Sequence, residues 1–108
     1  MSSAGLVAMG VVRAKLGQEH ELGRRMVSLL APTRAEPGCL SYDLFQSTED
    51  PGIWVLIERW RSLADLESHV RTSHMAAFLE RSGEVLENPP NNFRLKPVSA
   101  VGDFDEER

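Results

Sequence analysis

The chain has 108 residues, of which 42% are hydrophobic, and its formal net charge at pH 7 is −4. A chain of this length forms one domain and buries roughly 60 to 70% of the surface that it exposes when unfolded. No apolar run approaches the roughly 20 residues that cross a bilayer, and there is no basic stripe, so we expect neither a membrane nor a nucleic-acid partner. The single cysteine, Cys39, allows no internal disulfide. This suits a reducing compartment, and we expect a cytoplasmic protein.

The net charge is concentrated at the C-terminus. Four acidic residues and one arginine lie within the last six residues, so the rest of the chain is close to neutral. Such an end is typically solvated and frayed. We therefore expect a single domain over residues 1–101 and an acidic tail over residues 102–108.

A strand and a helix are expected first. Apolar residues alternate on both sides from Leu6 to Leu16, which indicates a strand with two covered faces, and Gly17 ends it. From Gln18 to about Ala31 the apolar residues recur with helical spacing, which predicts an amphipathic helix. Pro32 cannot continue this helix without the loss of a hydrogen bond, so we expect an end or a kink nearby. The apolar face of the helix is formed by Leu22, Met26, Leu29 and Leu30.

Two similar turns frame the next strand. Residues 36–39 and 50–53 both carry proline at the second position and glycine at the third, which predicts two type II turns. Between them residues 39–47 alternate as a strand, and its short link to the following strand predicts an antiparallel hairpin. Tyr42 on this strand is either an amphipathic packing residue or a ligand contact.

The run from Ile53 to Trp60 is the richest in β-branched and aromatic residues and predicts a central strand. Alternation places Trp54, Leu56, Glu58 and Trp60 on one face and Ile53, Val55, Ile57 and Arg59 on the other. The first face therefore sets the carboxylate of Glu58 between two indoles. Glu58 either pairs with an arginine at the rim or serves a pocket, and the sequence leaves both open.

The remaining elements are a helix pair and a last strand. Ser62 is a good N-cap for a short helix, with Asp65 in its first turn. A second helical piece runs from His74 to about Leu86, and Gly83 is a weak point within it. Residues 88–91 contain two prolines and stop the helix, and residues 93–101 are expected to form an edge strand.

The predicted order is strand, helix, strand, strand, helix pair and strand. This is the split βαβ pattern of a ferredoxin-like α+β fold, in which helices cover one face of a four-stranded antiparallel sheet. The other face, with Val55 and Ile57, is also apolar. We therefore expect a homodimer whose two sheets pack face to face.

Part of the sequence resembles a known family. The residues that carry the resemblance are Glu36 to Leu44, Val55 to Ser62, Leu66, His69, Ser73 to Met75 and Phe78. This pattern is similar to that of the antibiotic biosynthesis monooxygenases. The resemblance implies a dimeric α+β barrel with a pocket in each subunit, and an oxygenase that uses no metal or flavin on quinol-like or polyketide substrates. The same fold also carries haem-degrading enzymes, an isomerase and proteins without known activity.

Oxygenation without a cofactor makes modest demands on the protein. Triplet oxygen needs an electron-rich substrate anion, so the protein must bind a flat apolar molecule, remove one proton and exclude water. Histidine suits the proton transfer because its unperturbed pKa lies near neutrality. The candidate catalytic residues are His69, His74 and Glu58. The candidate substrate-binding residues are Tyr42, Trp54, Trp60 and Phe78.

Each candidate also has a structural interpretation. His69 follows Leu66 by three residues and could lie at a helix surface or pack against a carbonyl, and His74 could have a local capping role. Trp54 and Trp60 could belong to the core or to a dimer interface. A pattern alone does not separate fold from function.

Other chemistries have less support. His69 and His74 are five residues apart, which does not place them on one helical face for a metal, so no metal site and no cofactor are expected. His20 lacks the second histidine of a zinc-protease motif, no glycine-rich phosphate loop is present, and Cys39 has no histidine near it in sequence. The residues that the resemblance would require for haem degradation are missing.

The leading hypothesis is a cofactor-independent monooxygenase that acts with O2 on a small quinol-like or polyketide aromatic. An isomerase or proton-transfer enzyme on a small carbonyl compound would use the same histidines and Glu58 without oxygen. A ligand-binding dimer without catalysis is the third hypothesis.

Overall fold

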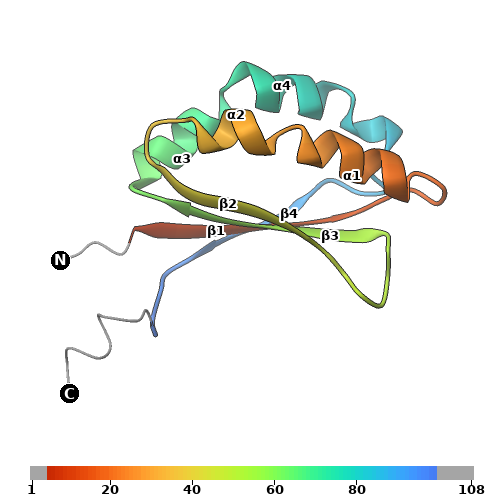
Figure 1. Cartoon of the computed structure of the whole chain (residues 1–108), viewed down its shortest axis with the longest axis horizontal. Helices are drawn as coiled ribbons and strands as arrows, with labels where there is room; N and C mark the ends of the chain where they lie inside the picture. Colours follow the sequence, from red (N-terminus) through yellow and green to blue (C-terminus); the bar gives the residue numbers. More distant parts are fainter. Residues whose placement is uncertain (1–4, 100–108) are drawn as a thin grey trace.

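The computed structural model describes residues 5–99 as an antiparallel sheet of four strands with helices on one face (Figure 1). The sheet order is β2-β3-β1-β4, so β3 and β1 are central, as expected for β3, and β4 is an edge. The predicted ferredoxin-like α+β fold is confirmed. The strands are β1 (Leu6–Arg13), β2 (Cys39–Gln46), β3 (Ile53–Trp60) and β4 (Asn91–Leu95). The helices are α1 (Glu19–Val27), α2 (Leu30–Arg34), α3 (Leu63–Val70), α4 (Ser73–Glu80) and the 3₁₀ turn η1 (Ser82–Glu84).

The predicted first helix is two helices. The backbone leaves the α-helical pattern after Val27 and resumes in α2 at Leu30. Pro32 lies in the first turn of α2, where a backbone N–H has no partner within the helix, so its missing donor costs little. The break that Pro32 predicted therefore occurs just before it.

The last helix is shorter than predicted, because α4 ends at Glu80 rather than near Leu86. Gly83 lies in η1, and the following Val85 and Leu86 turn into the core, where both are buried. Leu86 forms an isolated bridge with Ala14, which closes this end of the sheet. Glycine is a weak helix former, and the gain from burying two apolar side chains outweighs another helical turn.

The two proline-glycine turns differ. Gly38 has a φ of +83°, and the Cys39 N–H donates to the Glu36 carbonyl at 3.2 Å, which confirms the predicted type II turn. The second turn also closes with a hydrogen bond, from Ile53 N–H to the Asp50 carbonyl at 3.0 Å, but Gly52 does not have a positive φ. The type II prediction is wrong there. The Asp50 side chain accepts the Gly52 N–H at 3.0 Å and stabilises a different turn.

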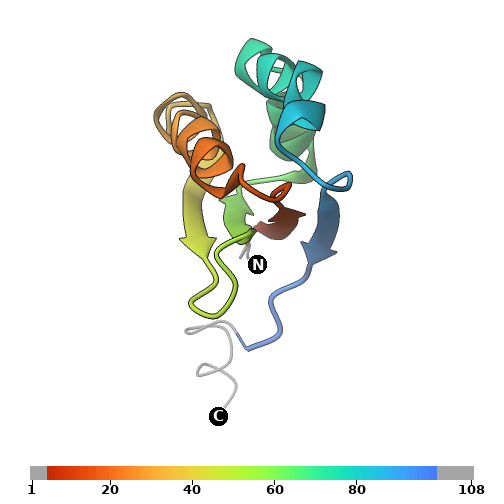
Figure 2. The same ribbon diagram turned by 90° about the vertical axis from the view of Figure 1, so that its right-hand side faces the viewer.

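The inner face of the sheet carries the core. The helices stand in two rows above it, α1 with α2 in one and α3 with α4 in the other (Figure 2). The predicted face of β3 with Trp54, Leu56, Glu58 and Trp60 points toward these helices. The largest side chains that are fully buried there are Trp60, Tyr42, Leu22, Met26 and His69. This arrangement places polar groups of three elements within the core.

Within residues 5–99, no helix covers the outer face of the sheet, as Figures 1 and 2 show. Alternation along the strands and their register give this face an apolar surface. Its apolar members are Val7, Met9, Val11, Phe45, Ile53, Val55, Ile57, Phe93 and Leu95, and charged residues such as Asp43 and Arg59 lie on the same face. Phe45 is 55% exposed. Large exposed apolar surfaces of this kind are typical of interfaces.

No helix within residues 5–99 is long and apolar enough to cross a membrane. Strand β4 ends at Leu95, two residues before Pro97, so the prediction of a strand over residues 93–101 is wrong at residues 96–99, and residues 100 and 101 lie outside the described residues. The expected domain end at residue 101 and the acidic tail lie outside them as well.

We predict that Gly38→Ala destabilises the protein, whereas Gly83→Ala does not. An alanine at position 38 would have to keep the left-handed backbone conformation of Gly38, at a cost of about 1–2 kcal/mol. Its methyl group would also collide with the Asp65 side chain at the start of α3. A Cβ at Gly83 meets no atom within 4 Å. Urea unfolding of both variants measures the difference, and equal midpoints would contradict this account of the turn.

Candidate functional site

A cavity of about 200 Å³ lies between the inner face of the sheet and the helices. Its walls are largely apolar, and they include Leu56, Leu66, Met75 and Phe78. The small residues of β1 create the space, because the backbone of Gly10 forms part of the wall. A Cβ at Gly10 would have only the Asn92 Oδ1 atom nearby, at 3.3 Å.

Three buried polar side chains from three different elements line this cavity, and the exposed Asn92 and Arg94 of β4 line it as well. Tyr42 on β2 is the direct cross-strand partner of Glu58 on β3, so both project from the same face of the sheet. His69 reaches the cavity from α3. All three are buried, with exposed fractions of 1% for Tyr42, 9% for Glu58 and 2% for His69.

Glu58 is held by its neighbour on the same strand face. The Trp60 indole Nε1–H donates to Glu58 Oε1 at 2.9 Å, because residues i and i+2 of a strand point the same way. Burial raises the pKa of the Glu58 carboxyl, and the nearby Glu36 adds to the rise, while the Trp60 hydrogen bond and His69 oppose it. Of the two interpretations that the sequence left open, the structure agrees with the pocket, because Glu58 lines the cavity and accepts a hydrogen bond from an indole.

His69 is fixed by aromatic packing and by one hydrogen bond. Its ring lies 4.9 Å from the Trp60 ring, centroid to centroid, and meets Tyr42 edge-on at 5.4 Å. Its Nδ1 atom lies 2.9 Å from Glu36 Oε2. Because the carboxylate can only accept, the hydrogen bond assigns a proton to Nδ1 in neutral His69, and Nε2 then carries the lone pair.

His74 shares the same carboxylate oxygen, with its Nε2 atom 2.7 Å from Glu36 Oε2. The helix that contains His69 ends at Val70, and α4 starts again at Ser73 with Thr72 as its N-cap. Because this break turns the chain, two histidines five residues apart converge, although they would diverge on one continuous helix. The inference from spacing that His69 and His74 do not lie together for a metal assumed one continuous helix, and it is therefore wrong.

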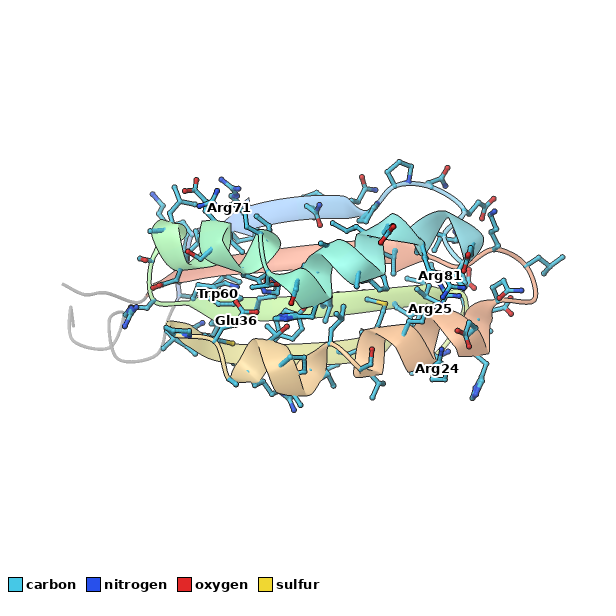
Figure 3. The ribbon with its side chains drawn as sticks, turned by 90° about the horizontal axis from the view of Figure 1, so that it is seen from above. Arg24, Arg25, Glu36, Trp60, Arg71 and Arg81 are labelled. Atoms are coloured by element: carbon cyan, nitrogen blue, oxygen red, sulfur yellow. The ribbon has the colours of Figure 1, made fainter. Side chains whose placement is uncertain are left out.

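Glu36 is the residue that the sequence did not single out. It belongs to the resemblance pattern, but only as the first residue of a turn. The turn at Gly38 returns the chain into β2 and leaves the Glu36 side chain, 11% exposed, facing both imidazoles. Figure 3 shows Glu36 beside Trp60, toward one end of the sheet. A glutamate and two histidines within one resemblance pattern were the only available signal.

The remaining predicted residues divide into two groups. Phe78 lines the cavity, whereas Trp60 lies behind it as the support of Glu58 and His69. Trp54 packs against Gly23 of α1 and is not among the residues that line the cavity. His74 lines a separate outer groove with Arg24, Arg25 and Arg81, two of which, Arg25 and Arg81, appear together toward the other end of the molecule in Figure 3.

The hydroxyl of Tyr42 is a neutral donor in this site. Burial and the charge of Glu58 raise its pKa, and the Thr33 hydroxyl acts weakly in the opposite direction. Neither hydroxyl has a hydrogen-bond partner among residues 5–99. The Tyr42 O–H group can therefore donate to an oxygen atom of a bound molecule.

The family model described as antibiotic biosynthesis monooxygenase matches residues 5–81 of the chain. The chain belongs to this family. A Mycobacterium tuberculosis relative with the name "Putative monooxygenase Rv0793" is 44% identical over 66% of this chain and 69% of its own length. The Escherichia coli relative "Probable quinol monooxygenase YgiN" is 33% identical over 76% of this chain and 89% of its own. These names support a monooxygenase at the level of the family.

The fold has a close counterpart among solved structures. The crystal structure of PA3566 from Pseudomonas aeruginosa aligns with a TM-score of 0.86 and 34% identity, over 92% of this chain and 99% of that one. The architecture of this family member is thus shared over nearly the whole described chain.

An uncharacterized protein of Synechocystis is 29% identical over 78% of this chain, which spans only 57% of that relative.

We predict that Glu58→Gln alters the pH dependence of stability. A carboxyl whose pKa is higher in the folded state binds its proton more tightly there, so stability falls as pH rises from the unfolded pKa through the raised folded pKa. Glutamine retains the acceptor for the Trp60 indole and does not titrate. Urea unfolding at a series of pH values should show a smaller decline for the variant, and an unchanged or steeper decline would contradict the assigned direction.

Proposed function

We propose that this protein is a cofactor-independent monooxygenase that oxidises a small hydroxylated aromatic with O2. The observation that carries the proposal is the pair of Glu36 and His69, whose Nδ1–Oε2 distance is 2.9 Å, at the wall of a buried apolar cavity. A carboxylate that accepts from one imidazole nitrogen leaves the other nitrogen as the base. The family and the printed names of its relatives support the oxygenase class.

The first step is the removal of a phenolic proton by His69 Nε2. The resulting phenolate can give one electron to O2, which a neutral phenol does poorly, and the two radicals then combine as a peroxide at the para carbon. The peroxide takes the proton that His69 had accepted, and its collapse then breaks the O–O bond, converts the C–H carbon to a carbonyl and releases water. One oxygen atom enters the quinone product and the other leaves as water, so the substrate supplies all the electrons.

The other residues of the site have supporting roles. Glu36 stabilises the imidazolium of His69 after proton transfer, and the hydrogen bond from His74 keeps the carboxylate in position. The Tyr42 O–H donates to the anionic oxygen of the substrate, and the apolar walls exclude water. The cavity is smaller than the roughly 300–1,000 Å³ of sites for drug-sized ligands, which favours a substrate of one or two rings.

We predict that His69→Asn lowers kcat by about 10²–10⁴-fold, the usual contribution of a positioned general base. Oxygen consumption with a panel of hydroxynaphthalenes and hydroquinones measures the rate, and His20→Asn, which changes an exposed histidine of α1, is the matched control. Turnover of the same compounds without oxygen would show that the protein is an isomerase and not a monooxygenase. Equal rates for His69→Asn and wild type would exclude His69 as the general base.

Gly10→Val tests the cavity without removing a polar group. The new methyl groups would enter the space beside Asn92 and reduce substrate binding. The free energy of unfolding of this variant shows whether the fold is retained. If the folded variant binds and oxidises the substrates as the wild type does, the reaction takes place elsewhere.

We also propose that two copies associate through the outer sheet face, as the apolar surface of that face suggests. A stable interface of standard size buries about 1,200–2,000 Å² in total, and a four-stranded apolar face is suited to this. The two sheets would then protect each other, and each cavity would remain within its own subunit.

We predict that Ile57→Glu weakens this dimer by about 3 kcal/mol or more, because it would bury an unpaired charge at the centre of the face. Leu16→Glu is the control, since Leu16 is 96% exposed and lies outside the strands. Sedimentation velocity over a range of concentrations measures both variants. Identical sedimentation of Ile57→Glu and wild type would place the contact on another surface, and a monomeric wild type would exclude the dimer.

A further inference from the structure

Three potential metal ligands converge beside the cavity. One carboxylate oxygen of Glu36 and one ring nitrogen each of His69 and His74 all lie within 4.8 Å of one another. They come from the turn before β2, from α3 and from α4, so the tertiary fold rather than a sequence motif brings them together. Two imidazoles and one carboxylate form a ligand set that suits first-row transition metals.

The distances are compatible with an ion after small side-chain rotations. Metal bonds of about 2.0–2.2 Å at tetrahedral angles place neighbouring ligand atoms about 3.4 Å apart. The two present separations from Glu36 Oε2, 2.9 Å and 2.7 Å, are shorter because hydrogen bonds span them. The two ring nitrogens must therefore move roughly 0.5 to 0.7 Å away from the shared oxygen.

The charge in this region also favours a cation. The side chain of Glu36 is 11% exposed, and among residues 5–99 its ion-pair partners are the two histidines and no lysine or arginine. Glu58, close enough to interact electrostatically with Glu36, adds a second carboxyl to the same buried region. A buried carboxylate is stabilised by a positive charge, and neutral imidazoles supply none.

We propose that Glu36, His69 and His74 form a site for a divalent transition-metal ion such as Zn²⁺ or Co²⁺, with water as a further ligand. His74, 23% of whose side chain is exposed, is the ligand that solvent reaches most easily. The ion displaces the protons that now hold the cluster together. Binding is therefore weaker at low pH, where the histidines are protonated.

Occupation of the site would act on the base described above. A metal ion on His69 Nδ1 leaves the ring proton on Nε2, so the nitrogen that faces the substrate cannot accept a proton. Zn²⁺ would then inhibit the oxidation. This consequence rests on the proposed function, whereas metal binding itself does not.

The test is calorimetric titration of chelator-treated protein with Zn²⁺, together with the visible absorption of Co²⁺ added to the same protein. We expect one ion per chain and a Co²⁺ spectrum of low-symmetry nitrogen and oxygen coordination. Glu36→Gln and His74→Asn should each lower the affinity more than about 100-fold, beyond the usual effect of losing an outer partner of a metal ligand. His20→Asn should bind as the wild type does, and Mg²⁺, which prefers oxygen ligands, should not compete.

Several results would overturn the site. These are the absence of Zn²⁺ binding at neutral pH, unchanged affinity in Glu36→Gln and His74→Asn, or loss of binding in His20→Asn. Thermal unfolding of each variant with chelator present shows that it is folded, so a loss of affinity is not a loss of structure. Zn²⁺ binding without any oxygen consumption by the metal-free protein would leave the site intact and exclude the proposed function instead.

Discussion

The shared carboxylate of Glu36 is the interaction on which the site depends. One oxygen atom receives hydrogen bonds from imidazoles of two separate helices, and so ties the turn before β2 to α3 and α4. Charge-assisted hydrogen bonds contribute more than neutral ones, about 1.5–3 kcal/mol each. The same contact orients the ring of His69 and selects the tautomer in which Nε2 carries the lone pair. Structure and chemistry therefore rest on one side chain.

The site also depends on what the first strand lacks. Ala8 and Gly10 give β1 little side-chain volume at this part of its inner face, and β3 and β2 supply Glu58 and Tyr42 there instead. A close-packed interior would normally fill this space. An apolar cavity with polar groups gathered at one part of its wall is the usual form of a small-molecule site. The cavity therefore lacks packing contacts that a filled interior would have, and a bound ligand can make such contacts with its walls.

The two faces of the sheet differ in the side chains that they carry. The inner face combines the aromatic packing of Trp60 with a hydrogen bond to a buried carboxyl, whereas the outer face is mainly apolar, with Asp43 and Arg59 as charged members. A surface with Val55 and Ile57 at its centre has no use in an isolated chain. Association through this face would leave the inner cavity undisturbed, so the same fold can support a dimer and a separate site in each subunit.

The sequence alone determined the order of elements, the strand faces and the position of the hairpin, because these follow from local periodicity and turn chemistry. The alternation from Trp54 to Trp60 was enough to place Glu58 on one face with the two indoles, and the tertiary structure decided that this face lies under the helices. The predicted element boundaries were wrong where tertiary contacts competed with helix propensity. At Gly83, for example, the chain has already left the helix and goes on to bury Val85. The cluster of Glu36, His69 and His74 was decided only by the tertiary structure. A distance between side chains on three elements depends on how a turn and a helix break orient the chain, and neither spacing nor composition contains that information.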